Sequence, residues 1–148
     1  MIAGIQTLVY TRLMYPGESA LSWPLFGVLS FITIILAAGG YVINDYYDIK
    51  ADSINKPDLI IAGRLWSLSK VKWVYFVLTG LGLILSIWLS LKLNLLEYLF
   101  IYPLAVLGLW FYSYRMKCMA IIGNIWVAVF CAFVIGIVAL LKRSCNKC

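Results

Sequence analysis

Long stretches without any charged residue constrain this chain more than any other feature. Four runs of 17 to 26 residues lack Asp, Glu, Lys and Arg, namely residues 19–44, 73–91, 98–114 and 118–141. About 20 apolar residues span the hydrocarbon core of a bilayer as a helix, which satisfies its backbone polar groups internally. A transmembrane barrel would instead show stretches of about ten alternating residues. The runs predict an all-α, polytopic bundle of transmembrane helices.

The N-terminal segment is a weaker candidate for a helix. Residues 1–11 are apolar, but Arg12 interrupts the segment and Pro16 ends it. It lacks the basic start and the cleavage site of a signal peptide. We therefore expect a short first helix, about five helices in all, and one transmembrane domain over residues 1–148. A soluble domain is excluded because 64% of the residues are hydrophobic and 12% are charged, against about 45–50% and about 25% in soluble domains.

The net charge of +6 comes from basic residues that lie mainly between the apolar runs. Segments 45–72 and 115–117 are both basic, so the positive-inside rule places them on the cytoplasmic side of a membrane, which we expect to be the plasma membrane. Contact with anionic membrane lipid explains this charge more simply than nucleic acid does, and no nucleic-acid partner is expected. The basic residues after Leu141 conflict with this topology, so we expect residues 142–148 to be an atypical tail.

Polar residues at helical spacing follow the first long run. If the helix continues past residue 44, four of them share or border one face: Asn44, Asp45, Asp48 and Asp52. Clustered carboxylates repel one another at a membrane boundary, and a divalent cation relieves that repulsion. Carboxylate and amide oxygens suit Mg²⁺, which commonly shares its coordination with substrate phosphates. The alternative is a solvated acidic helix end that pairs with Lys50 and Lys56.

Basic residues near these acids extend the hypothesis. Lys56 and Arg64 follow them in the same segment, and Arg115 and Lys117 lie on the same predicted side of the membrane. Carboxylates, Mg²⁺ and basic side chains together form a diphosphate site, and a hydrophobic bundle implies a diphosphate with an apolar tail. Alternatively, each base is only a positive-inside anchor.

Two motifs resemble the UbiA superfamily of intramembrane prenyltransferases. Residues 44–52 read N-D-x-x-D-x-x-x-D, are entered by Gly-Tyr-Val-Ile at 40–43, and are followed by Asn-Lys-Pro at 55–57. Residues 112–117 and 123–128 are similar to the family's Tyr/Lys segment and its following G-N-x-x-V-A helix start. The residues of these two motifs are most similar to those of the geranylgeranylglycerol-phosphate geranylgeranyltransferase branch.

The resemblance implies the N-terminal half of a nine-helix fold with a polar cap over a lipid-facing chamber. It implies that Asn44, Asp45, Asp48 and Asp52 hold Mg²⁺ and prenyl diphosphate, with Lys117 and a neighbouring tyrosine binding the diphosphate. The family often has a tyrosine four residues before that lysine, where this chain has Ser113 between Tyr112 and Tyr114.

The expected reaction transfers a prenyl group from its diphosphate to a small acceptor, such as a glycerol-phosphate lipid or an aromatic ring. Mg²⁺ and basic groups stabilise the departing diphosphate. Four aromatic faces could stabilise the carbocation-like tail: Tyr46, Tyr47, Tyr112 and Tyr114. Two other classes remain open, namely a non-catalytic membrane protein that binds prenyl lipid or partner helices, and a small transporter. The position of the acids at a helix end counts against the transporter.

The family's second aspartate-rich motif has no counterpart, because no Asp or Glu follows Glu97. We expect the chain to be a truncated fragment with little or no activity alone; the alternative is half a site that another chain completes. Cys145 and Cys148 cannot build a four-ligand zinc site, because a second cysteine pair and histidine are lacking.

Overall fold

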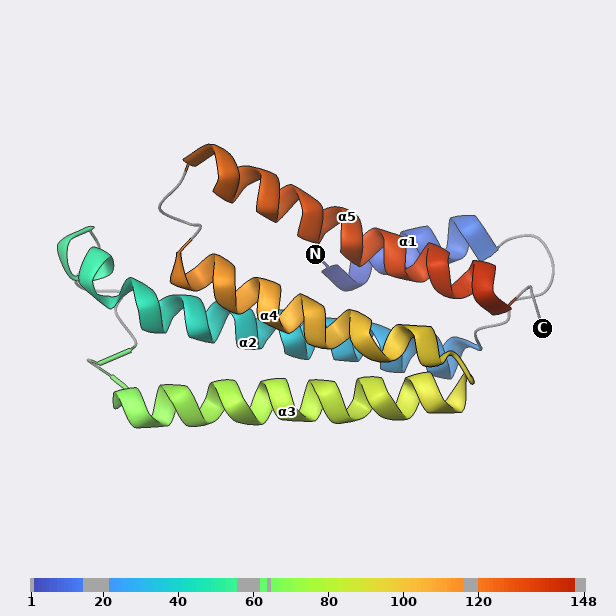
Figure 1. Ribbon diagram of the computed structural model, residues 1–148, viewed down its shortest axis with the longest axis horizontal. Coiled ribbons are helices and arrows are strands. Elements are labelled where there is room, and N and C mark those ends of the chain that lie inside the picture. Colours follow the sequence, from blue (N-terminus) through green and yellow to red (C-terminus); the bar gives the residue numbers. More distant parts are fainter. Residues whose placement is uncertain (1, 15–21, 56–61, 64, 116–119, 146–148) are drawn as a thin grey trace.

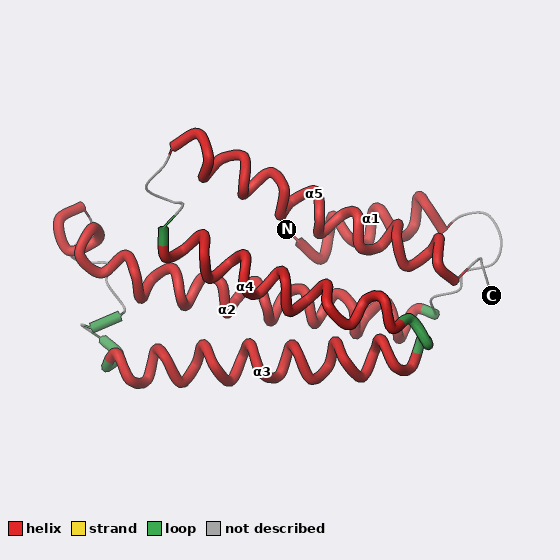
Figure 2. The backbone as a smooth tube through the Cα atoms, viewed as in Figure 1, coloured by secondary structure: helices red, strands yellow, loops and turns green. Residues whose placement is uncertain are grey.

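The chain folds into helices that run back and forth along one long axis (Figures 1 and 2). The computed structural model describes residues 2–14, 22–55, 62–63, 65–115 and 120–145. Its elements are α1 (Ile2–Met14), α2 (Trp23–Asn55), α3 (Leu68–Lys92), the 3-10 helix η2 (Leu96–Phe100), α4 (Ile101–Tyr114) and α5 (Ala120–Cys145). Within these ranges the chain forms no strand, and one isolated bridge joins Ala62 to Trp66. The expected all-α bundle of about five helices is confirmed.

The length and composition of two helices suit a membrane. Trp23–Ile49 of α2 and Leu68–Lys92 of α3 are long and apolar enough to cross a bilayer, whereas Ile101–Tyr114 and Gly123–Val138 are shorter apolar helices. Pro24 lies in the first turn of α2 and Pro103 in the first turn of α4, where the missing backbone N–H of proline breaks no helical hydrogen bond. The two helices of spanning length indicate an integral membrane protein.

Three helices extend beyond the charge-free runs that predicted them. α2 continues past residue 44 to Asn55. α3 begins at Leu68 rather than at residue 73, because the Ser67 side chain caps the helix and accepts a hydrogen bond from the Lys70 N–H at 3.4 Å. α5 continues to Cys145, so residues 142–145 of the expected tail belong to the helix. No proline or glycine follows Leu141, and lysine and arginine are good helix formers.

Small residues bring α2 and α3 close together over most of their length. A Cβ atom at Gly39 would lie 3.2 Å from the Thr79 hydroxyl, and one at Gly82 would collide with the Leu36 side chain. Close approach of this kind is typical of packed helices in membranes, where small residues allow extensive van der Waals contact. α3 thus packs closely along α2, the helix that carries the acidic segment.

The buried core lies toward the other end of the bundle, at the start of α2 and the end of α3 (Figure 1). Leu29 and Ile32 of α2 pack there with Ile137 of α5. The fully buried Gln6 of α1 donates from Nε2 to the Thr33 hydroxyl at 3.1 Å and to the Val134 carbonyl at 3.4 Å. Gln6 therefore joins α1 to both α2 and α5.

Candidate functional site

Both sequence motifs lie at the same end of the bundle. The C-terminal ends of α2 and α4 and the N-terminal ends of α3 and α5 gather at the left of Figure 1. This follows from the antiparallel order of consecutive helices. Segments 44–55 and 112–115, which are far apart in the sequence, therefore share one end of the fold.

The continuation of α2 through Asn55 places the acidic positions on one helical face, as the spacing predicted. Asn44 donates from Nδ2 to Oδ2 of Asp48 at 2.7 Å. Asp45 is exposed and Asp48 is partly exposed. The backbone of Asp52 belongs to the same helix, while its side chain lies outside the described residues. The amide of Asn44 thus fixes the direction of one carboxylate.

An apolar strip continues the acidic face down the same helix. Positions 31, 34, 41, 45 and 48 follow one another at spacings of three, four or seven residues, so they share a face. The exposed fractions of the apolar members are 52% for Phe31, 42% for Ile34 and 71% for Tyr41. α2 therefore presents carboxylates at its polar end and an open apolar surface next to them.

The oxygen atoms of Asn44 and Asp48 on the acidic face of α2 are of the kind that bind a hard divalent cation. Oδ1 of Asn44 is buried and has no hydrogen-bond partner within the part of the chain that the structure describes. An unpaired carbonyl oxygen beside a carboxylate is a ligand pair that Mg²⁺ prefers. No group of three His, Cys, Asp or Glu side chains that could hold a metal occurs among those same residues. The expected ligand set, which includes Asp52, stays a prediction.

Aromatic rings connect the first motif to the second. The ring centroids of Tyr47 on α2 and Tyr114 on α4 are 5.7 Å apart, in an edge-to-face arrangement. Tyr46 lies 5.4 Å from Tyr47, also edge to face. Tyr112 is half-buried on α4, and its ring meets no other aromatic ring within the described part of the chain. Of the two tyrosines that flank Ser113, Tyr114 is the one that contacts the first motif.

Two residues at this end were not among the predicted site residues. The ring of Trp110 stacks on Tyr114 at 5.4 Å with an interplanar angle of 4°. Nζ of Lys72, on the first turns of α3, lies 5.1 Å from the centroid of the Tyr46 ring. The four-residue spacing from Trp110 to Tyr114 is a signal in the sequence, whereas the position of Lys72 depends on how α3 packs against α2.

An apolar groove begins next to these rings. It lies between α4 and α5 and has a volume of about 560 Å³, within the range of small-molecule sites. Trp110 and Phe111 line it from α4, and Trp126 and Phe130 line it from α5. The indole N–H of Trp126 donates to the Gly108 carbonyl at 3.1 Å, which ties the two helices together. Trp110 belongs both to the groove and to the aromatic chain that leads to Tyr47.

Several predicted site residues cannot be located relative to this end. Lys56, Arg64 and Lys117 lie outside the described residues. Arg115 is exposed directly after α4, and its backbone N–H donates to the Phe111 carbonyl at 3.0 Å. The predicted contributions of these bases to a diphosphate site remain predictions.

Comparison with known proteins identifies relatives of the chain. Residues 4–143 match the model of the UbiA prenyltransferase family. The digeranylgeranylglyceryl phosphate synthase of Sulfurisphaera tokodaii is 35% identical over 108 residues, which are 72% of this chain and 37% of that protein. Its namesake in Sulfolobus acidocaldarius is 37% identical over 106 residues, with the same coverage of each chain.

A further namesake in Methanosarcina barkeri is 41% identical over 73 residues, or 48% of this chain and 24% of that protein. The chain thus matches little more than a third of the length of the first two relatives and about a quarter of the third. No solved structure matches it. The family model covers nearly all of the chain, including both motifs and the helices that carry them, so the chain belongs to the UbiA prenyltransferase family.

Proposed function

We propose that this chain carries the prenyl-diphosphate-binding part of a Mg²⁺-dependent prenyltransferase. The prenyl group would move from its diphosphate to a small acceptor, for which a glycerol-phosphate lipid is the first candidate and an aromatic ring the second. One observation carries the proposal: Tyr47, from the acidic segment of α2, meets Tyr114, and Tyr114 stacks on Trp110, which lines the apolar groove. A ligand with a charged head and an apolar tail matches this arrangement.

The head of the substrate would bind at the end of α2. Asn44, Asp45, Asp48 and Asp52 would hold Mg²⁺, and the bound metal would neutralise negative charge on the diphosphate. The hydrogen bond from Asn44 to Asp48 supports this role, because it orients a carboxylate without consuming the Oδ1 atom of Asn44. Lys56, Arg64 and Lys117 would add positive charge around the diphosphate.

The tail of the substrate would lie along apolar surface. The groove between α4 and α5 supports this, because its lining is almost wholly apolar and extends from Trp110 back to the start of α4 and along the middle of α5. The exposed strip of Phe31 and Ile34 on α2 would offer further contact.

In the reaction, the bond between the allylic carbon and the diphosphate oxygen breaks, and the oxygen leaves with the electron pair. Positive charge then develops on the prenyl carbon, and the faces of Tyr47 and Tyr114 would stabilise it by cation–π interaction. The acceptor oxygen or ring carbon forms the new bond and loses its proton. Tyr46 and Tyr112 would line the surroundings of this step.

The acceptor and the membrane orientation are also proposals. The name of these relatives refers to a glyceryl phosphate, which supports a glycerol-phosphate lipid as the acceptor. The basic segments 45–72 and 115–117 favour a cytoplasmic location for the site, at the plasma membrane. An acceptor with a phosphate head would meet the same positive charge as the prenyl diphosphate.

The test compares Asp48→Asn with Glu18→Gln, which removes one negative charge outside the motif. Purified protein in nanodiscs is titrated with geranylgeranyl diphosphate at several Mg²⁺ concentrations, and product is assayed with a glycerol-phosphate lipid. The same change at the matching position of a relative from Sulfurisphaera tokodaii gives the turnover readout.

We expect Mg²⁺-dependent binding that Asp48→Asn weakens about 100-fold and Glu18→Gln leaves intact. Unchanged binding and turnover in Asp48→Asn would refute the assigned role. Binding by this chain that Asp48→Asn leaves unchanged, with no product formed, would instead indicate a non-catalytic lipid-binding protein.

A further inference from the structure

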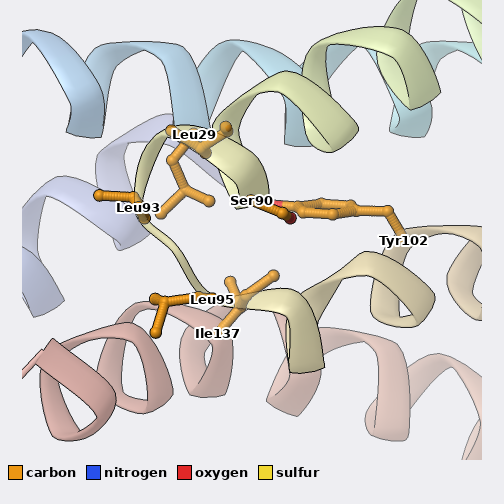
Figure 3. A pocket seen from close by; sticks show the side chains of 7 residues that line it. Leu29, Ser90, Leu93, Leu95, Tyr102 and Ile137 are labelled. Atoms are coloured by element: carbon orange, nitrogen blue, oxygen red, sulfur yellow. The ribbon is translucent and has the colours of Figure 1, made fainter. Parts of the chain in front are cut away.

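A small cavity lies at the opposite end of the bundle from the candidate site, where α3 turns into α4. Its volume is about 10 Å³, about that of one water molecule by this measure. It is enclosed by α2, α3, α4 and α5 and by the connection that follows α3 (Figure 3). Its lining residues are Leu29, Leu89, Ser90, Leu93, Leu95, Tyr102 and Ile137. Two of these seven, Ser90 and Tyr102, carry a hydroxyl group.

The hydroxyl of Tyr102 is the unusual group in this cavity. The side chain is 4% exposed, and its oxygen has no hydrogen-bond partner among the residues that the structure describes. The Thr33 hydroxyl lies beside it and acts on it as a weak hydrogen-bonding neighbour, but the two oxygens do not meet the distance and angle of a full hydrogen bond. Thr33 already donates to the Leu29 carbonyl at 3.0 Å and accepts from Gln6. A buried hydroxyl without a partner is costly, so a partner is expected for Tyr102.

Ser90 supplies the second polar atom. Its Oγ donates to the Ser86 carbonyl at 2.9 Å, which leaves the lone pairs of Oγ able to accept. In Figure 3 the ring of Tyr102 extends from α4 toward Ser90, across the cavity. A donor that lies between them could therefore bond to both oxygens.

We propose that this cavity is the binding site of one ordered water molecule, which donates to Ser90 Oγ and bonds to the Tyr102 hydroxyl. A buried water needs two to four polar partners and about this much room, and the cavity provides both. The water joins the last turn of α3 to the first turn of α4. It thereby holds the start of the helix whose other end carries Tyr114.

The experiment is a double-mutant cycle on the full chain in detergent micelles, with denaturant unfolding as the readout. Tyr102→Phe removes one hydroxyl, and Ser90→Ala removes the other. Ser86→Ala is the matched control, because Ser86 is also buried on α3 and donates to a carbonyl of its own helix, that of Leu83, at 2.8 Å, yet it does not line the cavity.

With a bridging water, Tyr102→Phe destabilises the fold, and the Tyr102→Phe/Ser90→Ala pair shows about two- to fivefold coupling in the unfolding constant. The pair with Ser86→Ala is additive. Without the water, Tyr102→Phe removes an unpaired hydroxyl, so it leaves stability unchanged or raises it, and both pairs are additive. The proposal is overturned if Tyr102→Phe leaves stability unchanged or raises it, or if the Tyr102→Phe/Ser90→Ala pair is additive. A crystal structure in a lipid phase gives a second test, since density for a solvent oxygen within hydrogen-bond distance of both hydroxyls supports the proposal and its absence from a well-defined map refutes it.

Discussion

The ring of Tyr47 meets the ring of Tyr114 edge to face, with their centroids 5.7 Å apart. One belongs to the acidic motif on α2, and the other follows the buried Ser113 at the end of α4. Trp110 stacks on the second ring, so the contact continues into the groove between α4 and α5. This single contact gives the two motifs a common location.

We predict that Tyr47→Leu and Tyr114→Leu are energetically coupled. An edge-to-face pair contributes about 0.5–1.5 kcal/mol beyond its buried area, so the double variant should lose less stability than the sum of the single variants by that amount. Denaturant unfolding in micelles measures the coupling. The control pair is Tyr47→Leu with Tyr112→Leu, which should be additive. Equal coupling in both pairs would show that Tyr114 has no special contact with α2.

We predict opposite effects of alanine at two neighbouring glycines of α3. A Cβ at Gly82 collides with Leu36, whereas one at Gly80 meets no atom within 4 Å. Gly82→Ala should therefore destabilise the bundle by about 1–3 kcal/mol. Gly80→Ala should stabilise it by about 0.5–1 kcal/mol, because alanine loses less backbone entropy in a helix. Thermal unfolding of both variants checks this, and a stabilising Gly82→Ala would contradict the close packing of α2 and α3.

We predict a modest coupling between Gln6 and Thr33. Their 3.1 Å hydrogen bond joins α1 to α2 inside the core. Side-chain hydrogen bonds between membrane helices average about 0.6 kcal/mol, so the Gln6→Leu/Thr33→Val cycle should give about that value. Gln6→Leu combined with Thr79→Val, on α3, is the control and should be additive. A coupling near zero in the first cycle would mean that the hydrogen bond between Gln6 and Thr33 does not help to hold α1 against α2.

We predict that Asn44 is needed for metal binding. Asn44→Leu keeps the side-chain volume but removes both the Oδ1 atom and the hydrogen bond that orients Asp48. Mn²⁺, used as a paramagnetic substitute for Mg²⁺, should bind about 10–100-fold more weakly. Gln6→Leu removes an amide at the other end of the bundle and should leave Mn²⁺ affinity intact. Equal affinity in Asn44→Leu and the unchanged protein would rule out a ligand role for this residue.

Helix positions were predictable from the sequence because each depends on local chemistry. A long uncharged run in a bilayer satisfies its backbone only as a helix, and the runs at 19–44 and 98–114 correspond to α2 and α4. The register of Asp45 and Asp48 follows from the helical period once the helix continues. Family membership was predictable for the same reason, since both motifs are local.

Helix ends were less predictable, because charge marks the edge of an apolar run and not the end of a helix. Lys70 and Lys72 lie outside the run at 73–91 but inside α3, which begins after the Ser67 cap. Long basic side chains can keep their charge in water while their backbone stays helical. The same argument applies to the last residues of α5, which continue the helix beyond Leu141.

Only the tertiary structure decided which residues meet. Tyr112 and Tyr114 are equivalent in the sequence, and the packing of α4 against α2 placed Tyr114 against Tyr47. The sequence by itself determined a membrane helix bundle with an acidic face, because periodicity and hydropathy act within one helix. The aromatic connection and the groove between α4 and α5 arose from packing between helices, which depends on the shapes of residues far apart in the chain.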